Sequence, residues 1–262
     1  MKKMIAILLI LSMILAFAAC AKPQTPAETQ APAQTEAPAQ TEAPVQTEAP
    51  EETEPAEEKP AVMSHEEYIA AELNAAVTIE TYVQNHQSWW DNKITVYCQS
   101  PDGAYFLYEL ACSEEDAAKL VPGTKILVNG FKGEWAGEVE VMEGSFTFVD
   151  DGDTFIAEAL DVTDLLGTDE LIAHQNEFVS FTGMTVEKIE YKNGAPGDDI
   201  YLTLGYNGAS YSFCVEVYLT GTEHDVYTTV GTLKVGDVVD VEGFLYWYEG
   251  ANPHITAIAV AE

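Results

Sequence analysis

One twelve-residue phrase occurs twice in this chain and constrains its fold more than any other feature. Residues 120–131 are LVPGTKILVNGF and residues 233–244 are LKVGDVVDVEGF, so both fit Leu-x-x-Gly-x-x-Ile/Val-x-Val-x-Gly-Phe. The Leu-x-x-Gly part is typical of a short helix that ends in a tight turn. The rest alternates apolar and polar residues, which predicts a half-buried strand. The closing Gly-Phe predicts a sharp bend, and a strand curled in this way belongs in a small closed barrel.

The elements around each copy of the phrase also repeat in the same order. Each unit is predicted to hold three strands, a short helix, the strand of the phrase and a last strand, with a further helix in front. In the first unit we expect a helix opened by the capping box Ser64-x-x-Glu67, strands near 77–83, 94–98 and 105–109, a helix capped by 113–116, and a last strand over 138–149. In the second unit we expect a helix opened by 168–170, strands near 178–181, 200–204 and 211–213, a helix capped by 222–225, and a last strand over 254–260.

This order is that of the OB-fold, a five-stranded Greek-key barrel with its helix between the third and fourth strands. The predicted fold class is therefore mainly β with short helices, as two tandem five-stranded OB-fold Greek-key barrels after a signal peptide and a disordered linker. The expected boundaries are 1–20 for the signal peptide, 21–62 for the linker, 63–152 for the first barrel and 153–262 for the second.

The first twenty residues have the features of an export signal. Two lysines precede an apolar run over residues 4–19, which is shorter than the ~20 residues that a spanning helix needs. The run ends in Phe17-Ala18-Ala19-Cys20. This ending resembles the bacterial lipobox, although Phe17 stands where leucine is usual. The resemblance implies a lipidated Cys20 with further acyl chains such as palmitate, and a membrane-anchored protein that faces the outside of the cell. The alternative is an ordinary cleaved signal followed by a chance cysteine.

Residues 21–62 are rich in proline, glutamate, threonine and alanine. A Thr-Glu-Ala-Pro unit recurs at residues 35–38, 41–44 and 47–50. Proline at this density opposes helices and strands and favours an extended chain. We expect a disordered spacer that holds the barrels away from the membrane, and the sequence leaves open whether its threonines are glycosylated.

The charge of the chain is strongly one-sided. There are 44 acidic residues against 11 lysines and no arginine, and residues 61–262 hold 35 acidic residues and seven lysines. Such a surface repels phosphate backbones, so the charge argues against a nucleic-acid partner despite the fold. Beyond Cys20, an odd set of three cysteines remains, Cys98, Cys112 and Cys214, and we expect all three to be buried and free.

Several aromatic stretches also resemble a known group of proteins. Residues 87–90 (QSWW), 102–106 (DGAYF) and 244–250 (FLYWYEG) are similar to stretches of uncharacterised surface lipoproteins of anaerobic bacteria. The resemblance implies a tandem OB-fold lipoprotein, and it implies no established activity.

The titratable residues show no catalytic pattern. The five histidines lack metal spacing, and no nucleophile elbow or phosphate-binding glycine loop occurs. The acidic turn at residues 150–153 (DDGD) has too few correctly spaced ligands for a calcium loop, so a solvated turn is favoured and calcium stays open. We therefore expect no enzyme, no cofactor and no metal.

The candidate ligand-binding residues are aromatic: Trp89, Trp90, Trp135, Trp247 and Tyr248. A tryptophan beside a carboxylate can stack on a sugar ring and bind its hydroxyls, which makes a carbohydrate or cell-wall-derived ligand the first hypothesis. The second hypothesis is a structural or protein-interaction module at the cell surface, in which the tryptophans belong to the core. An OB-fold that binds nucleic acid is a third, disfavoured by charge.

Overall fold

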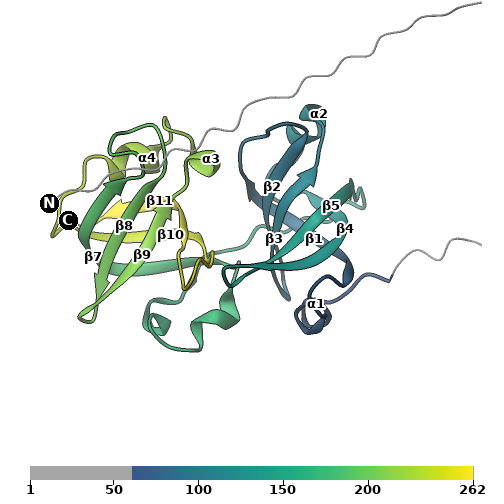
Figure 1. Cartoon of the computed structure of the whole chain (residues 1–262), viewed down its shortest axis with the longest axis horizontal. Coiled ribbons are helices and arrows are strands. Elements are labelled where there is room, and N and C mark those ends of the chain that lie inside the picture. The colour runs from purple at the N-terminus through teal and green to yellow at the C-terminus, as the bar shows by residue number, and fades with distance from the viewer. Residues whose placement is uncertain (1–60, 262) are drawn as a thin grey trace, which may run out of the picture. The chain divides into compact units, whose positions relative to one another are not determined.

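The computed structural model describes residues 61–261, and these residues fold into two β-barrels of the same strand order (Figure 1). The predicted signal peptide, Cys20 and the linker up to residue 60 lie outside the described residues. In the described part, no helix is both long and apolar enough to span a membrane.

The first barrel is closed in the order β1-β2-β3-β5-β4. Adjacent strands are antiparallel except β3 and β5, which run parallel. Its elements are α1 (His65–Ala70), β1 (Ala76–His86), β2 (Lys93–Ser100), β3 (Gly103–Ala111), α2 (Glu114–Ala117), β4 (Lys125–Trp135) and β5 (Glu138–Phe148).

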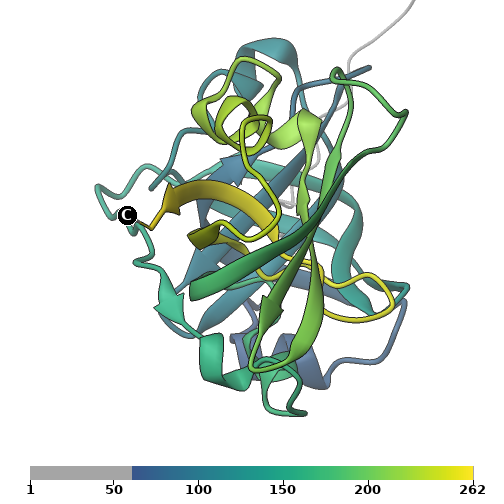
Figure 2. The same ribbon diagram turned by 90° about the vertical axis from the view of Figure 1, so that its left-hand side faces the viewer.

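The second sheet has the order β10-β11-β9-β8-β7-β6, and β10 also pairs with β7, which closes its five long strands as in the first barrel. β9 and β11 take the parallel place of β3 and β5. Its elements are β6 (Leu160–Asp161), η1 (Thr163–Leu165), η2 (Leu171–His174), β7 (Phe178–Tyr191), β8 (Ile200–Tyr206), β9 (Ala209–Val215), α3 (Val217–Thr220), α4 (Asp225–Val230), β10 (Val238–Phe244) and β11 (His254–Val260). Figure 2 shows β11 as the yellow arrow that ends near the C-terminus.

The duplicated Gly-Phe bends the strand as predicted. Gly130 of β4 and Gly243 of β10 both lie where the register shifts against the following strand. A Cβ on Gly243 would collide with the backbone carbonyl of His254, and one on Gly130 would lie 2.9 Å from the carbonyl oxygen of Met142. Only glycine permits this close approach of two backbones, so the phrase closes each barrel by the same means.

The copies also agree where the chain enters the first strand of each barrel. Asn74 and Asn176 both have left-handed backbones, with φ of 67° and 70°. Asparagine tolerates this conformation better than other residues with a Cβ. The agreement of two such positions supports the alignment of the two units.

Each barrel has its own apolar core, because alternate residues of each strand point inward. A third, smaller cluster joins the barrels and consists of Tyr97 and Phe106 from the first barrel with Leu219 and Phe244 from the second. Cys98, Cys112 and Cys214 are buried and free, as predicted, and burial raises the pKa of all three thiols.

Three local predictions need correction. The first helix, whose apolar residues up to Leu73 predict an end near Asn74, ends at Ala70 instead, where Lys132 Nζ binds the carbonyls of Ile69 and Ala71. The cap of α4 is His224, whose side chain accepts the N–H of Val226, rather than Thr222. The extra turn α3, between β9 and α4, was not predicted.

Candidate ligand-binding cleft

The outer face of β2 and β3 is the surface through which OB-folds bind ligands. In this chain the second barrel covers the centre of that face. The Tyr97 ring stacks on Phe244 with centroids 4.6 Å apart, and the Tyr97 hydroxyl lies 2.7 Å from Nδ1 of His254. Tyr97 and its neighbour Phe106 are 1% and 3% exposed. What stays open is the end of the face next to the β1–β2 connection.

That connection ends in a tight turn that fixes Trp90. The backbones of Trp90 and Lys93 exchange two hydrogen bonds, of 3.0 and 2.9 Å, around Asp91 and Asn92. Asp91 and Asn92 are both left-handed, with φ of 47° and 61°, as a two-residue type I′ hairpin turn requires. The carbonyl of Asn92 also accepts the N–H of Cys112, so the turn is tied to the barrel.

The two adjacent tryptophans have different surroundings. Trp89 is half-buried, packs against the core of the first barrel and donates its indole N–H to the carbonyl of Cys112 at 2.9 Å. Trp90 is 79% exposed. Trp89 therefore anchors the turn, and the fixed turn presents Trp90 to solvent.

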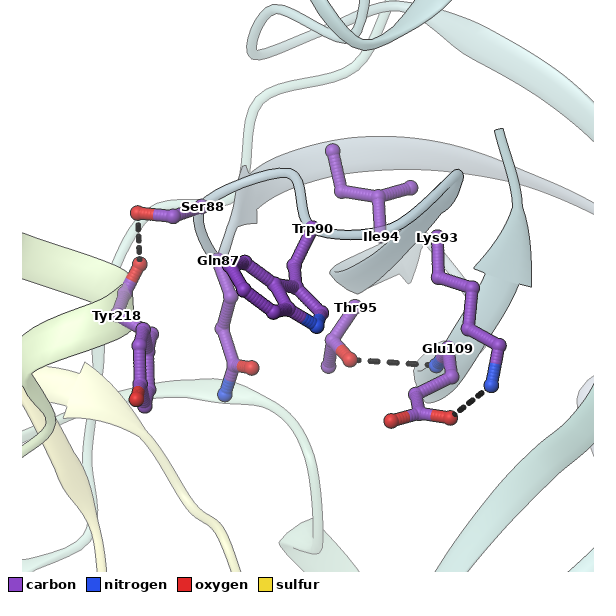
Figure 3. A pocket seen from close by; sticks show the side chains of 8 residues that line it. All are labelled: Gln87, Ser88, Trp90, Lys93, Ile94, Thr95, Glu109 and Tyr218. Carbon is purple, nitrogen blue, oxygen red and sulfur yellow. Dashed lines mark hydrogen bonds and ion pairs between the residues drawn. The ribbon is translucent and has the colours of Figure 1, made fainter. Parts of the chain in front are cut away.

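Trp90 borders a cleft of about 280 Å³ that residues from both barrels line (Figure 3). We call this the Trp90 cleft, and its lining residues are Gln87, Ser88, Trp90, Lys93, Ile94, Thr95, Glu109 and Tyr218. Tyr218 comes from α3 and is 60% exposed. Its carbonyl accepts the backbone N–H of Ser88 at 2.7 Å and the Ser88 hydroxyl at 3.2 Å, so α3 is joined to the first barrel.

An ion pair forms the side of the cleft away from Tyr218 (Figure 3). Lys93 Nζ lies 2.6 Å from Glu109 Oε2, and this bond to the carboxylate raises the pKa of Lys93. Glu109 has a left-handed backbone, with φ of 48°, and donates its N–H to the Thr95 hydroxyl at 3.2 Å. The cleft thus combines an exposed aromatic face with hydrogen-bond donors and acceptors held by the sheet.

The other predicted ligand residues form a separate group. Trp135 and Tyr248 are 55% and 47% exposed, and their ring centroids are 5.1 Å apart. Trp247 is half-buried against the core of the second barrel. These three lie where the β4–β5 turn meets the β10–β11 connection, joined by a 2.8 Å hydrogen bond from the N–H of Glu249 to the carbonyl of Ala136. None of them lines the Trp90 cleft.

Most of the cleft was missed by the sequence analysis. Lys93 lies on the polar side of a strand whose inward residues were predicted, so its exposure could have been predicted. Thr95 lies on the same side but is only 5% exposed. Glu109 was also placed in a strand, but its bulge was not expected. Nothing in the sequence pointed to Tyr218, because its short helix was not predicted.

The most perturbed acids lie at the junction of the barrels. Burial raises the pKa of Glu138 to about 8 and those of Glu140 and Glu216 to about 7. Glu138 Oε2 accepts the backbone N–H of Trp247 at 2.7 Å, while its Oε1 has no hydrogen-bond partner. Burial also lowers the pKa of His254 to about 3. These groups do not line the Trp90 cleft. Burial is the main cause of their shifts, and neighbouring carboxylates add to it, Glu140 at Glu138 and Asp199 at Glu216.

A lysine pairs with two carboxylates of the acidic turn at residues 150–153. Lys125 Nζ lies 2.8 Å from both Glu80 and Asp151 and 3.6 Å from Asp153. The Tyr82 hydroxyl donates to Asp153 at 2.6 Å. The ammonium holds the place of a cation, and residues 61–261 contain no group of three or more side chains suited to a metal ion.

No protein-family model matches the chain, and no curated protein matches its sequence. Among solved structures, the p204 HINb domain is 12% identical with a TM-score of 0.35, over 73% of this chain and 100% of that one. A murine DNA-binding protein bound with double-stranded DNA is 10% identical with a TM-score of 0.36, over 71% and 95%. A replication protein A heterotrimer bound to single-stranded DNA is 14% identical with a TM-score of 0.29, over 72% and 49%. At such scores the OB-fold assignment rests on the strand order and register of this chain.

Proposed function

We propose that this protein is a lipid-anchored, outward-facing binding protein that holds a carbohydrate or cell-wall-derived glycan in the Trp90 cleft. The observation that carries the proposal is the 79% exposed Trp90, which a tight turn fixes beside a polar cleft. An indole face suits the apolar face of a sugar ring. Gln87, Thr95 and Glu109 offer the hydrogen bonds that sugar hydroxyls need.

Nucleic acid fits this surface less well than a neutral sugar. Residues 61–262 have 35 acidic residues against seven lysines, which repel a phosphate backbone. Tyr97 and Phe106, the aromatic pair at the centre of the β2–β3 face, are buried under the second barrel and have no free face for a base.

A binding role also accounts for the site better than a catalytic one. The acids with the most raised pKa values, such as Glu138, are buried at the junction, whereas catalysis needs such groups next to the ligand. The Trp90 cleft holds one carboxylate, Glu109, and that carboxylate is paired with Lys93.

The binding proposal is tested by titrating the full chain with β-1,4-linked N-acetylglucosamine oligomers, which are neutral, and with anionic oligogalacturonates, in a calorimeter. We expect the neutral oligomers to bind and Trp90→Ala to abolish that binding. Trp135→Ala, which removes another exposed tryptophan, is the matched control and leaves binding intact. Absence of neutral glycan binding, or equal losses in the two variants, would sink the proposal.

The membrane anchor needs its own experiment. Export of the chain in cells fed labelled palmitate is expected to place the label on the protein, and Cys20→Ser is expected to remove the label and release the protein from the membrane. A Cys20→Ser protein that still fractionates with the membrane would argue against this anchor.

A protein-interaction module is the second candidate. A groove of about 620 Å³ between α1 and η2 has Ile69 and Ile172 on its rim, 49% and 44% exposed. Exposed apolar side chains around a groove are a feature of protein interfaces. Two results together would support a protein-interaction module. Glycans would fail to bind, and a protein that co-purifies with the wild type would be lost from an Ile69→Asp variant but retained by Trp90→Ala.

A further inference from the structure

A second cleft adjoins the Trp90 cleft across the same two strands. It has a volume of about 600 Å³ and shares Lys93 and Glu109 with the Trp90 cleft. We call it the Tyr108 cleft, and its lining residues are Asp91, Asn92, Lys93, Tyr108, Glu109, Ala111, Met142, Glu143 and Gly144. The turn after Trp90 also belongs to it, so both clefts are built on the same fixed segment.

The Tyr108 cleft has an aromatic wall of its own. Tyr108 is 43% exposed on the outer face of β3. Its ring lies nearly parallel to that of Phe106, at 27° with centroids 6.5 Å apart, and Phe106 is buried. Tyr108 is therefore an exposed ring that stands next to a buried ring two positions earlier on the same strand, and this neighbour limits its movement toward the junction. Met142 adds apolar surface from β5.

The shared wall is polar on both sides. The Lys93–Glu109 pair is about half exposed, at 52% and 44% of its side-chain surface. It therefore keeps donors and acceptors free for a ligand beyond the bond within the pair. A chain that crosses from one cleft to the other meets this pair midway between two aromatic surfaces.

The charges around the Tyr108 cleft select against anions. Asp91, Glu109 and Glu143 supply three carboxylates, and Lys93 is the one cation among the lining residues. Phosphates and uronates would face net repulsion here, whereas neutral hydroxyl and acetamido groups would not.

Resting on the proposed function, we infer that the Trp90 and Tyr108 clefts are neighbouring subsites for one extended, neutral oligosaccharide. Trp90 stacks on a sugar ring at one end, Tyr108 stacks on a ring further along, and the Lys93–Glu109 pair binds hydroxyls between them. The ligand is thus an oligomer rather than a single sugar.

The test is the dependence of affinity on ligand length. Full-length protein is titrated with β-1,4-linked N-acetylglucosamine oligomers of two to six rings. We expect affinity to rise about tenfold between the shortest and the longer oligomers, as one further stacked ring would give. Tyr108→Ala is expected to remove this rise in affinity, while the two-ring oligomer binds as tightly as it does to the wild-type protein. Unchanged binding of the two-ring oligomer also shows that the variant is folded. Tyr108→Phe keeps the ring and is expected to keep the rise.

The outcomes separate the two proposals. If Tyr108→Ala leaves the length dependence intact, or weakens every oligomer equally, the second subsite is refuted while the Trp90 site stands. If Trp90→Ala has no effect on any oligomer, the proposed function itself is wrong and the inference is overturned with it.

Discussion

The two barrels share one strand order but differ on the same outer face. On β2 and β3 the paired residues Tyr97 and Phe106 are aromatic and buried against the other barrel. At the matching register of β8 and β9 stand Thr203 and Ser212, of which Ser212 is exposed. The copies thus keep the inward residues that form a barrel and diverge in the outward residues, which decide what a barrel contacts.

This difference between the outer faces explains where the Trp90 cleft lies. The first barrel gives the centre of its face to the second barrel, and only the end near the β1–β2 turn stays open for a ligand. The second barrel lacks an aromatic turn at this place, where residues 192–199 form a longer loop of polar and small residues, but it supplies Tyr218 through α3. The site is therefore a joint product of two unlike copies.

The largest expected effect tests the contrast between the two faces. Tyr97→Ala removes a buried ring from the junction and is expected to lower the free energy of unfolding by about 4 kcal/mol, as large aromatic deletions in cores do. Thr203→Ala, at the matching position, is expected to change it by less than about 1 kcal/mol. Urea denaturation of both variants measures this, and equal losses would remove the contrast.

The next effect tests what the copies share. Gly243→Ala places a methyl group against the His254 carbonyl and is expected to destabilise the protein by about 3 kcal/mol. Gly130→Ala is expected to cost about 2 kcal/mol for the same reason. Gly231→Ala is the control, because that glycine has ordinary helical backbone angles. The added Cβ would lie 3.2 Å from the Tyr191 hydroxyl, at the end of a side chain, and 3.4 Å from a backbone atom, the Thr228 carbonyl oxygen. Thermal unfolding of the three variants measures these losses of stability. A Gly243→Ala variant as stable as the wild type would show that the bend does not need glycine.

A third experiment sharpens the electrostatic difference at the junction. The first barrel brings Glu138 with a pKa raised to about 8, and the second brings His254 with a pKa lowered to about 3, so both are held neutral at mildly acidic pH. The folded state keeps the Glu138 proton between pH 4.5 and 8 while the unfolded state loses it, so the contribution of Glu138 to stability is greatest below pH 4.5 and falls as the pH rises to 8. The lowered pKa of His254 acts in the opposite sense between pH 3 and 6.5, so the effect of Glu138 is measured from pH 6.5 upward. Glu138→Gln should flatten this fall and add about 2 kcal/mol at pH 8. Unfolding curves of both proteins at pH 6.5 and pH 8 measure it, and a wild-type protein that loses no more stability over this range than the variant would contradict the sign.

The smallest expected effect separates the two neighbouring tryptophans. Trp89→Phe loses the hydrogen bond to Cys112 and is expected to cost about 1 kcal/mol of stability. Trp90→Phe, at an exposed ring, is expected to cost almost nothing. Chemical denaturation monitored by circular dichroism compares them, and a larger loss at Trp90 would reverse their roles.

The fold could be predicted because its signals are local and repeated. Alternating strands, the capping box at Ser64 and the two Gly-Phe bends each follow from a short stretch of sequence, and the second copy checks the first. The site could be predicted only in part. Trp90 was among the predicted ligand-binding residues. Tyr218, which stands 128 positions further along the chain, reaches the cleft through a packing of the barrels that no local pattern encodes.

The turn α3 makes the Trp90 cleft depend on both barrels. It has no counterpart between β3 and α2, yet it carries one wall of the cleft. Two barrels that both lacked this turn would leave one side of the cleft without a wall, so the cleft depends on a difference between the copies. Either barrel expressed without its sibling should consequently present an unfinished binding surface.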